Sequence, residues 1–328
     1  MGGLMPIDTS LPSRGGGTGR PWAESALVLG AHLELARGKR KQNEVVEATN
    51  KRVSASYYSR LERGEVRIDK PHVVAIVLEA LGVAPGEYYD HLLDLAVAAS
   101  KEGWASRFRS GHREVVTDSI LRLASLEESA TEAYFLDREA FPGQLQTKAY
   151  ARLAARFTLP ASLRDAGMQN VVVGLRGERG HRLAERLAAK QTMARFFIDE
   201  GLLYRDFGHP EVQADQLQLM LDLIDNRVLP IGIRVMNRRF PQAVAFSTLA
   251  RLGFRHSLTD QVPDVIYNET GRQASFHRSS LPGSEEAADL DYVDLDDVID
   301  DVITLAPNRR ESRLIIENAL LETKFRLR

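Results

Sequence analysis

The sequence has no cysteine among its 328 residues. This absence excludes disulfides, thiolate catalysis and cysteine-ligated zinc sites, and it fits a protein of the reducing cytosol. Long apolar runs are missing too, since no stretch approaches the roughly 20 residues that a membrane-spanning helix needs. Residues 1–20 lack the apolar core of a secretion signal, so we expect a disordered polar tail there. We therefore expect a soluble cytoplasmic protein that makes no membrane contact.

The net charge is also small, at −2, but the charges are unevenly distributed along the chain. Residues 37–70 hold ten basic and five acidic side chains, whereas residues 284–301 hold nine acidic and no basic ones. A basic amino-terminal module on an otherwise acidic protein favours a local contact with a polyanion. A solvated charged face is the alternative interpretation.

Apolar residues recur at helical spacing in five short segments of the amino-terminal part. These segments run from 26 to 36, 43 to 50, 54 to 64, 72 to 82 and 85 to 96. Ser54 is a candidate N-cap for the third segment, which Gly64 ends. Five short helices within about 75 residues predict a small helical bundle.

The same segments carry motifs in a characteristic order: LxxxLxxAR at 29–37, SASYYSRLERG at 54–64, and HVVAIVLEALGV followed by PGEYY at 72–89. They resemble the Xre/Cro-type helix-turn-helix domain of transcriptional regulators. The resemblance implies a lambda-repressor-like bundle, mainly α-helical, that binds double-stranded DNA through residues 21–98. It also implies a structural ion pair between Arg37 and Glu62. The turn before the third helix is longer than is usual in that family.

The third segment is the expected recognition helix, because short polar side chains at its start can reach base edges in the major groove. The expected groove-facing residues are Ser54, Ala55, Ser56, Tyr57, Ser59 and Arg60. Arg60 is the candidate for a bidentate guanine contact, while Tyr58 and Leu61 face the core. The expected phosphate contacts, all in turns, are Lys39, Arg40, Lys41, Lys51 and Arg52. Pairing of Arg60 with an acid of its own module is the alternative.

A second resemblance begins after residues 99–117, which we interpret as a solvated linker. FPGQLQTKAYARLAAR at 141–156 has a turn at Pro142-Gly143 and then a helix capped by Thr147. This segment resembles the PGLLQT–YAR signature of a domain of unknown function that follows the helix-turn-helix in actinobacterial regulators. The resemblance extends over residues 120–320. That family has an R-x-x-R-Q helix, for which the nearest candidates here are Arg182, Arg186 and Gln191.

Residues 118–328 alternate between helical and strand patterns and predict an α+β domain with an antiparallel or mixed sheet. The strand candidates are 132–137, 194–200, 230–237, 244–250, 264–269 and 273–277. Because the last four follow one another closely, we expect them to form an antiparallel sheet. An amphipathic helix over 309–325 ends the sequence and packs on this domain or on a second protomer.

No constellation of catalytic residues stands out in this second domain. VVVGLRGERG at 171–180 places glycines after an apolar run, but neither P-loop nor Rossmann spacing is present, so we interpret it as a basic loop before a helix. The histidines have no partners at metal-ligand spacing. The acidic run at 285–301 fits no calcium loop, and we interpret it as a solvated loop. We expect no enzyme, no cofactor and no metal.

The sequence thus predicts a sequence-specific DNA-binding transcriptional regulator that is associated with the nucleoid. We expect a homodimer, because paired half-sites roughly 34 Å apart are the common solution for this class. Residues 118–328 are expected to sense a partner or an effector, and the resemblance implies a small protein partner. The candidate contact surfaces are Phe240-Pro241, the arginine face of 174–186 and the terminal helix. A repressor with a small-molecule pocket in the carboxy-terminal domain and an enzyme domain targeted to DNA remain alternatives.

Overall fold

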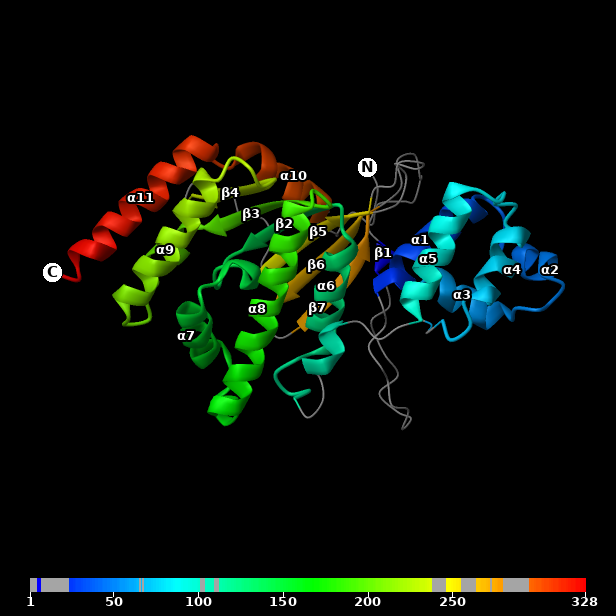
Figure 1. Cartoon of the computed structure of the whole chain (residues 1–328), viewed down its shortest axis with the longest axis horizontal. Coiled ribbons are helices and arrows are strands. Elements are labelled where there is room, and N and C mark those ends of the chain that lie inside the picture. Colours follow the sequence, from blue (N-terminus) through cyan, green and yellow to red (C-terminus); the bar gives the residue numbers. More distant parts are fainter. Residues whose placement is uncertain are drawn as a thin grey trace.

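Two parts with different architecture make up the chain, an amino-terminal helical bundle and a larger α+β domain (Figure 1). The computed structural model describes residues 5–6, 24–64, 66, 68–100, 104–108, 112–237, 246–254, 264–271, 273–279 and 295–328. In Figure 1 the bundle lies at one end of the molecule and the carboxy-terminal helix lies at the other.

The bundle contains five helices near the positions that the apolar periodicity predicts. They are α1 (Glu24–Arg37), α2 (Gln42–Ala48), α3 (Ala55–Glu62), α4 (His72–Ala80) and α5 (Glu87–Ala99). Gly38 and Gly64 follow α1 and α3 with positive φ angles of 57° and 65°, a conformation that ends helices and favours glycine. The bundle core includes Leu29, Tyr58 and Leu61, all fully buried.

Helix α1 is buried on two faces, although the sequence pattern indicated only one. Leu29 and Leu33 belong to the core of the bundle. Val28 and Ala31 belong instead to the core of the α+β domain, where α1 contacts α6 (Asp118–Ser129). A helix that is apolar around most of its circumference is expected to be buried on all sides. The bundle is therefore docked on the second domain through α1.

A seven-stranded mixed sheet forms the centre of the second domain, in the order β1-β7-β6-β5-β2-β3-β4. Its strands are β1 (Met5–Pro6), β2 (Glu132–Asp137), β3 (Met193–Asp199), β4 (Ile231–Met236), β5 (Thr248–Gly253), β6 (Val265–Thr270) and β7 (Gln273–Arg278). Strands β2, β3 and β4 run parallel, and the other pairings are antiparallel. The predicted α+β class with a mixed sheet is confirmed.

Two strand predictions were wrong in detail. Of the candidate at 244–250, residues 244 and 245 lie outside the described residues, Phe246 and Ser247 are not in a strand, and the strand runs from Thr248 to Gly253. Strand β4 lies at the sheet edge beside β3 and does not join the antiparallel group. The reason is the helix that precedes β4, because a helical crossover returns the chain parallel to the previous strand.

Helices cover both faces of the sheet. They are α6, α7 (Lys148–Thr158), α8 (Ala166–Ala188), α9 (Pro210–Asp225), α10 (Leu295–Leu305) and α11 (Arg309–Phe325), with short 3-10 turns η1 (Trp104–Phe108), η2 (Gly143–Leu145), η3 (Ala161–Leu163) and η4 (Glu200–Tyr204). Phe135 and Phe196 face the larger core, shared with α6, α9 and α11, whereas Leu136 and Phe197 face the core beneath α10. In the described ranges, no helix has the length and apolar character to cross a bilayer.

The predicted basic loop at 171–180 is wrong, because these residues lie inside α8. The glycines reflect close packing at specific points. A Cβ atom at Gly180 would lie 2.5 Å from the carbonyl oxygen of Gln144, so only glycine lets η2 approach α8 this closely. A Cβ atom at Gly174 would lie 3.2 Å from a ring carbon of Phe108.

Two further segments are more ordered than the sequence indicated. The connector at 99–117 is not simply solvated, since Ala105 and Val116 are buried together with residues of α6 and α8. Part of the acidic run forms α10, in which Asp300 lies 2.8 Å from the guanidinium of Arg251. In both segments, residues that read as polar connections carry enough apolar side chains to pack.

Candidate nucleic-acid interface

The position of α3 is set first by local sequence. The Ser54 hydroxyl accepts a hydrogen bond from the backbone N–H of Tyr57 at 3.2 Å, which is the N-cap predicted from the sequence. Tyr58 and Leu61 point into the bundle core and are completely buried. One face of this short helix is thus anchored, and its amino-terminal turn faces outward.

Gly30 of α1 lets the end of α3 approach α1 at backbone distance. A Cβ atom at this position would lie 2.2 Å from the carbonyl oxygen of Glu62 and 2.8 Å from that of Leu61. Because backbone atoms cannot move aside as a flexible side chain can, α3 can cross α1 here only above a glycine. Sequence reasoning missed this residue, and a glycine inside a helical pattern was the available signal.

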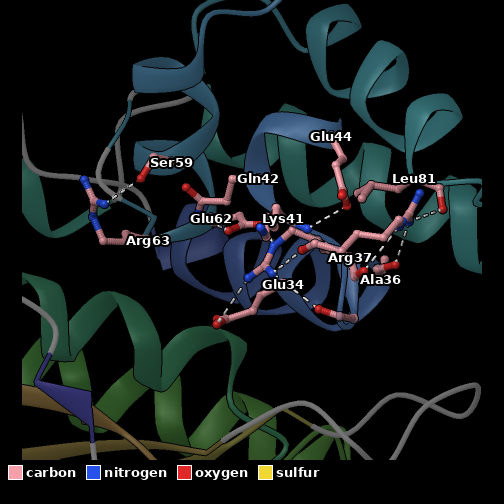
Figure 2. A network of polar contacts seen from close by, with 12 residues as sticks. Glu34, Ala36, Arg37, Lys41, Gln42, Glu44, Ser59, Glu62, Arg63 and Leu81 are labelled. Atoms are coloured by element: carbon pink, nitrogen blue, oxygen red, sulfur yellow. Dashed lines mark hydrogen bonds and ion pairs between the residues drawn. The ribbon is translucent and has the colours of Figure 1, made fainter. Parts of the chain in front are cut away.

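An ion pair ties the same end of α3 to α1 and α2 (Figure 2). Arg37 Nε donates to Glu62 Oε1 at 2.6 Å, as the sequence predicted, and Gln42 Nε2 donates to Glu62 Oε2 at 2.5 Å. The Glu62 side chain is only 3% exposed. Burial alone would lower the pKa of Arg37, but the hydrogen bond and charge of Glu62 raise it. Glu62 is therefore a paired structural acid, and Gln42 is a third member that sequence reasoning missed.

The expected groove-facing residues divide into two groups. Ser54, Ala55, Ser56 and Arg60 are exposed. Ser59 is half-buried, and its hydroxyl accepts a hydrogen bond from Arg63 Nη1 at 2.7 Å. Tyr57 is half-buried against the bundle core, and this burial raises its pKa. Four of the six residues thus present themselves fully to a partner.

Arg60 is placed to act on an external partner. Its side chain is exposed, and among the described residues it forms no ion pair. The alternative of pairing with an acid of its own module is therefore not observed in that part of the chain.

Four of the five predicted phosphate contacts lie exposed in the turns next to α2. Lys39 and Lys41 are in the α1–α2 turn, and Lys51 and Arg52 are in the α2–α3 turn. Lys51 lies 3.6 Å from Glu47, and Arg52 Nε donates to the carbonyl of Thr49 at 3.1 Å. These bonds leave most of the ammonium and guanidinium donors open. The long turn predicted before α3 is present, since α2 ends at Ala48 and α3 starts at Ala55.

Arg40 differs from the other four residues. Its guanidinium donates to the carbonyl oxygens of Ala36 and Arg37 in α1 and of Ala80 and Leu81 at the end of α4, at 2.8 to 3.3 Å. Carbonyls at helix carboxyl termini lack partners within their own helix, and a cation there is favourable. Its donors are thus engaged, and the geometry makes Arg40 a cap for two helices rather than a phosphate contact.

Two arginines of α8 lie beside the turn at Pro142-Gly143, and the sequence analysis did not single them out. Arg179 makes a two-bonded contact with Glu127, at 2.5 and 2.9 Å, and Arg176 Nη1 donates to Gln146 Oε1 at 3.2 Å. Arg176 and Arg179 have R-x-x-R spacing and lie beside Gly143 of η2, whereas the assignment of the family's R-x-x-R-Q helix to Arg182, Arg186 and Gln191 stays a prediction.

The three candidate contact surfaces of the second domain have different outcomes in the structure. The arginine face of 174–186 is directed inward, because Arg179 is only 8% exposed and Arg182 pairs with Glu128 at 2.7 Å. Phe240-Pro241 lies outside the described residues. Helix α11 does carry exposed apolar side chains, namely Leu314, Leu321 and Phe325. Among the described residues, no cluster of three or more acidic or histidine side chains is placed to hold a metal ion.

Comparisons with known families agree with this division. A model described as a helix-turn-helix domain matches residues 28–92, where α3 and its supports lie. Fold and site thus define the class as a helix-turn-helix DNA-binding regulator with an additional α+β domain. A model described as a domain of unknown function, DUF5753, matches residues 120–317, more than half of the chain, and the chain belongs to that family. No curated protein and no solved structure matches it.

Proposed function

We propose that this chain is a sequence-specific transcriptional regulator, of the Xre type and actinobacterial kind, that inserts the start of α3 into the major groove of an operator. The observation that supports this most is the exposed polar start of α3 on a helix whose other end is fixed by Gly30 and the Arg37–Glu62 pair. Direct readout requires a rigidly held helix with short polar side chains and an arginine on its free surface.

Phosphate contacts are assigned to the four exposed basic residues around α2. Lys39, Lys41, Lys51 and Arg52 flank α2, the helix that precedes α3 in the same small domain. Neutralising phosphates with such residues releases counterions, so operator affinity should fall steeply as salt increases. Sequence preference would come from Ser54, Ser56 and Arg60, because contacts to phosphate carry no base information.

The regulator would act in the cytoplasm, on the nucleoid, as a homodimer on two half-sites. One bundle of five short helices presents few base contacts, and pairing two copies on half-sites about 34 Å apart is the usual remedy. The DUF5753 domain would sense a small protein partner or an effector. Either one must bind two conformations of the chain with different affinity in order to change DNA binding.

Selection of duplex oligonucleotides with the full chain tests the recognition helix. Arg60→Ala should relax the preference at one base position and weaken operator binding by about 1–3 kcal/mol, and Ser56→Ala should alter a neighbouring position. Arg152→Ala is the matched control, because Arg152 is an exposed arginine on α7. If both α3 variants select the same sequences as the unmodified chain with equal affinity, α3 is not the recognition helix.

The enzyme alternative has one observation to consider. Burial raises the pKa of Asp137 to about 7 and also raises that of Glu269, and perturbed carboxylates can mark active sites. However, Asp137 accepts a hydrogen bond from Thr248 at 2.7 Å and Glu269 accepts one from Tyr267 at 3.0 Å. We assign both acids to the interior of the domain and propose no catalysis.

A further inference from the structure

The turn between α2 and α3 contains two adjacent residues with a left-handed backbone conformation. Asn50 and Lys51 have φ angles of 53° and 58°, and neither is glycine. This conformation is unfavourable for a residue with a Cβ atom, and residues other than glycine usually adopt it singly. Among the described residues, the other adjacent pair with positive φ is Phe207-Gly208, which includes a glycine. The pair Asn50-Lys51 is therefore exceptional within this chain.

The end of α4 is an internal comparison for this turn. After α4, the backbone N–H groups of Gly82 and Val83 donate to carbonyls of the last helical turn, both at 3.0 Å. After α2, the N–H groups of Asn50 and Lys51 donate in the same pattern, at 2.9 and 3.4 Å. Only the first residue of such a helix end has to be left-handed, and Val83 has no positive φ. The helix end thus accounts for Asn50 but not for the conformation of Lys51.

The turn is fixed at both ends and exposed at its tip. Thr49 and Val53 are 1% and 3% exposed, and the Thr49 hydroxyl donates to a carbonyl of α2 at 2.6 Å. Between them, Asn50, Lys51 and Arg52 are exposed. Among the described residues, the side-chain amide of Asn50 makes no hydrogen bond. Three side chains that carry N–H donors are thus held in solvent immediately before α3.

The backbone of this turn is not available as an anion site. Successive N–H groups around a left-handed residue can form such a site. Here, however, the N–H groups of Asn50, Lys51 and Arg52 already donate to carbonyls of α2 and of Thr49. A contact with an external partner must therefore be made by the side chains.

We propose that Asn50 is a further DNA contact, and that the left-handed pair Asn50-Lys51 directs both side chains at phosphates of one strand. This inference rests on the proposed function, because the strand is the one beside the groove that α3 enters. Asparagine amides are frequent donors to phosphate oxygens. Unfavourable backbone conformations cluster at functional surfaces, where the surrounding structure maintains them. The competing explanation is a purely structural turn that tolerates the pair.

Replacement of Asn50 by glycine separates the backbone from the side chain. Asn50→Gly relieves the backbone, so the folding equilibrium constant from urea unfolding should rise about 2- to 5-fold, even after glycine's larger loss of chain entropy. The same variant loses the amide, so operator affinity should fall about 10-fold, as expected for a hydrogen bond to a charged acceptor. A purely structural role predicts no loss of affinity in a more stable variant.

Lys190→Gly is the matched control. Lys190 is exposed, follows α8 in the second domain and has a φ angle of 55°. Its replacement should stabilise the chain by a similar factor and leave operator affinity unchanged. If Asn50→Gly also binds the operator with unchanged affinity, Asn50 makes no DNA contact and the proposal is overturned.

Asn50→Asp distinguishes a phosphate contact from a base contact. Aspartate also tolerates the left-handed conformation, but its charge is repelled by phosphate. This variant should bind the operator more weakly than Asn50→Gly and should select the same base sequence, because phosphate contacts carry no base information. A changed preference at one base position would refute the phosphate assignment.

The unmodified chain and Arg60→Ala, titrated with the same duplexes, separate this inference from the proposed function. If Arg60→Ala weakens operator binding but both Asn50 variants bind normally, the Asn50 contact is refuted and the recognition helix stands. If the unmodified chain binds no duplex even at low salt, the proposed function itself fails.

Discussion

The basic residues of the α1–α2 turn are alike in charge and position, but they have different roles. Lys39 is exposed, whereas Arg40 bonds four carbonyls at the ends of α1 and α4. The sequence predicted a phosphate contact for both, because composition and position are alike. Only the position of the carboxyl end of α4 within reach of Arg40 distinguishes them, and no local pattern encodes that position.

Arg40→Ala and Lys39→Ala should therefore affect different properties, the first the stability of the fold and the second the binding of DNA. Arg40→Ala removes hydrogen bonds at two helix ends and should lower the free energy of unfolding by about 1–3 kcal/mol. Lys39→Ala should change stability by less than about 0.5 kcal/mol but reduce the salt dependence of DNA binding by about one phosphate. Urea unfolding and a salt titration measure the two quantities. A normal stability for Arg40→Ala would contradict its role as a cap.

Asp137 should make stability depend on pH. Its folded-state pKa of about 7 lies above the unfolded value of about 3.9, because burial opposes its charge. The folded chain thus holds the proton more tightly, and its stability falls as pH rises from about 4 to about 7.

Asp137→Asn stays neutral and keeps an oxygen for the Thr248 hydroxyl, so it should escape this loss. Relative to the unmodified chain, its unfolding free energy should increase by roughly 2 kcal/mol between pH 5 and pH 8. Asp215→Asn, at an exposed position on α9, is the control and should show no such trend. A constant difference for Asp137→Asn across this range would show that Asp137 is ionised throughout.

At the scale of elements, local chemistry predicted most helices and strands of the chain. The cap at Ser54, the turn at Pro142-Gly143 and the strand candidate at 132–137 each have a short-range cause, and all three were located correctly. The elements that the sequence analysis assigned wrongly are those whose packing partners lie far away in the sequence. The glycines of α8 were interpreted as a loop because Gln144 of η2, which Gly180 accommodates, lies 36 residues earlier in the sequence. Helix α3 was predictable from its cap and apolar spacing, whereas the identity of the backbone that Gly30 accommodates depends on a segment about 30 residues away.

The crossing of α1 and α3 gives an element-scale prediction. Gly30→Ala places a methyl group against two backbone carbonyls and should cost roughly 1–3 kcal/mol or more. Gly177→Ala in α8 is the control, because a Cβ atom there meets nothing within 4 Å. It should stabilise the chain by about 0.5–1 kcal/mol through helix propensity. Thermal unfolding distinguishes the two. If Gly30→Ala is neutral, α3 is not fixed by this contact.

At the scale of the whole molecule, the arrangement of the parts limits how two copies can meet on DNA. The exposed apolar residues of α11 lie at the opposite end of the molecule from the bundle (Figure 1). A dimer joined through α11 would hold its two bundles far apart, which does not suit half-sites about 34 Å apart. The terminal helix is thus a poor candidate for the contact between protomers on an operator.

Leu321→Ser should accordingly leave the proposed dimerisation and the operator affinity unchanged. Leu321 is 61% exposed, so the substitution costs little packing. Sedimentation equilibrium and operator titration are the measurements. A variant that becomes monomeric and loses operator affinity would place the dimer contact on α11.

The double burial of α1 has a practical consequence for anyone who trims this chain to a minimal DNA-binding fragment. Cutting after residue 99 would strip away α6 and leave Val28 and Ala31 bare on the fragment's surface. Such a fragment would tend to stick to itself through a patch that the intact chain conceals. Dimerisation of the fragment would then be an artefact of the truncation. It would give no information on the oligomeric state of the intact chain.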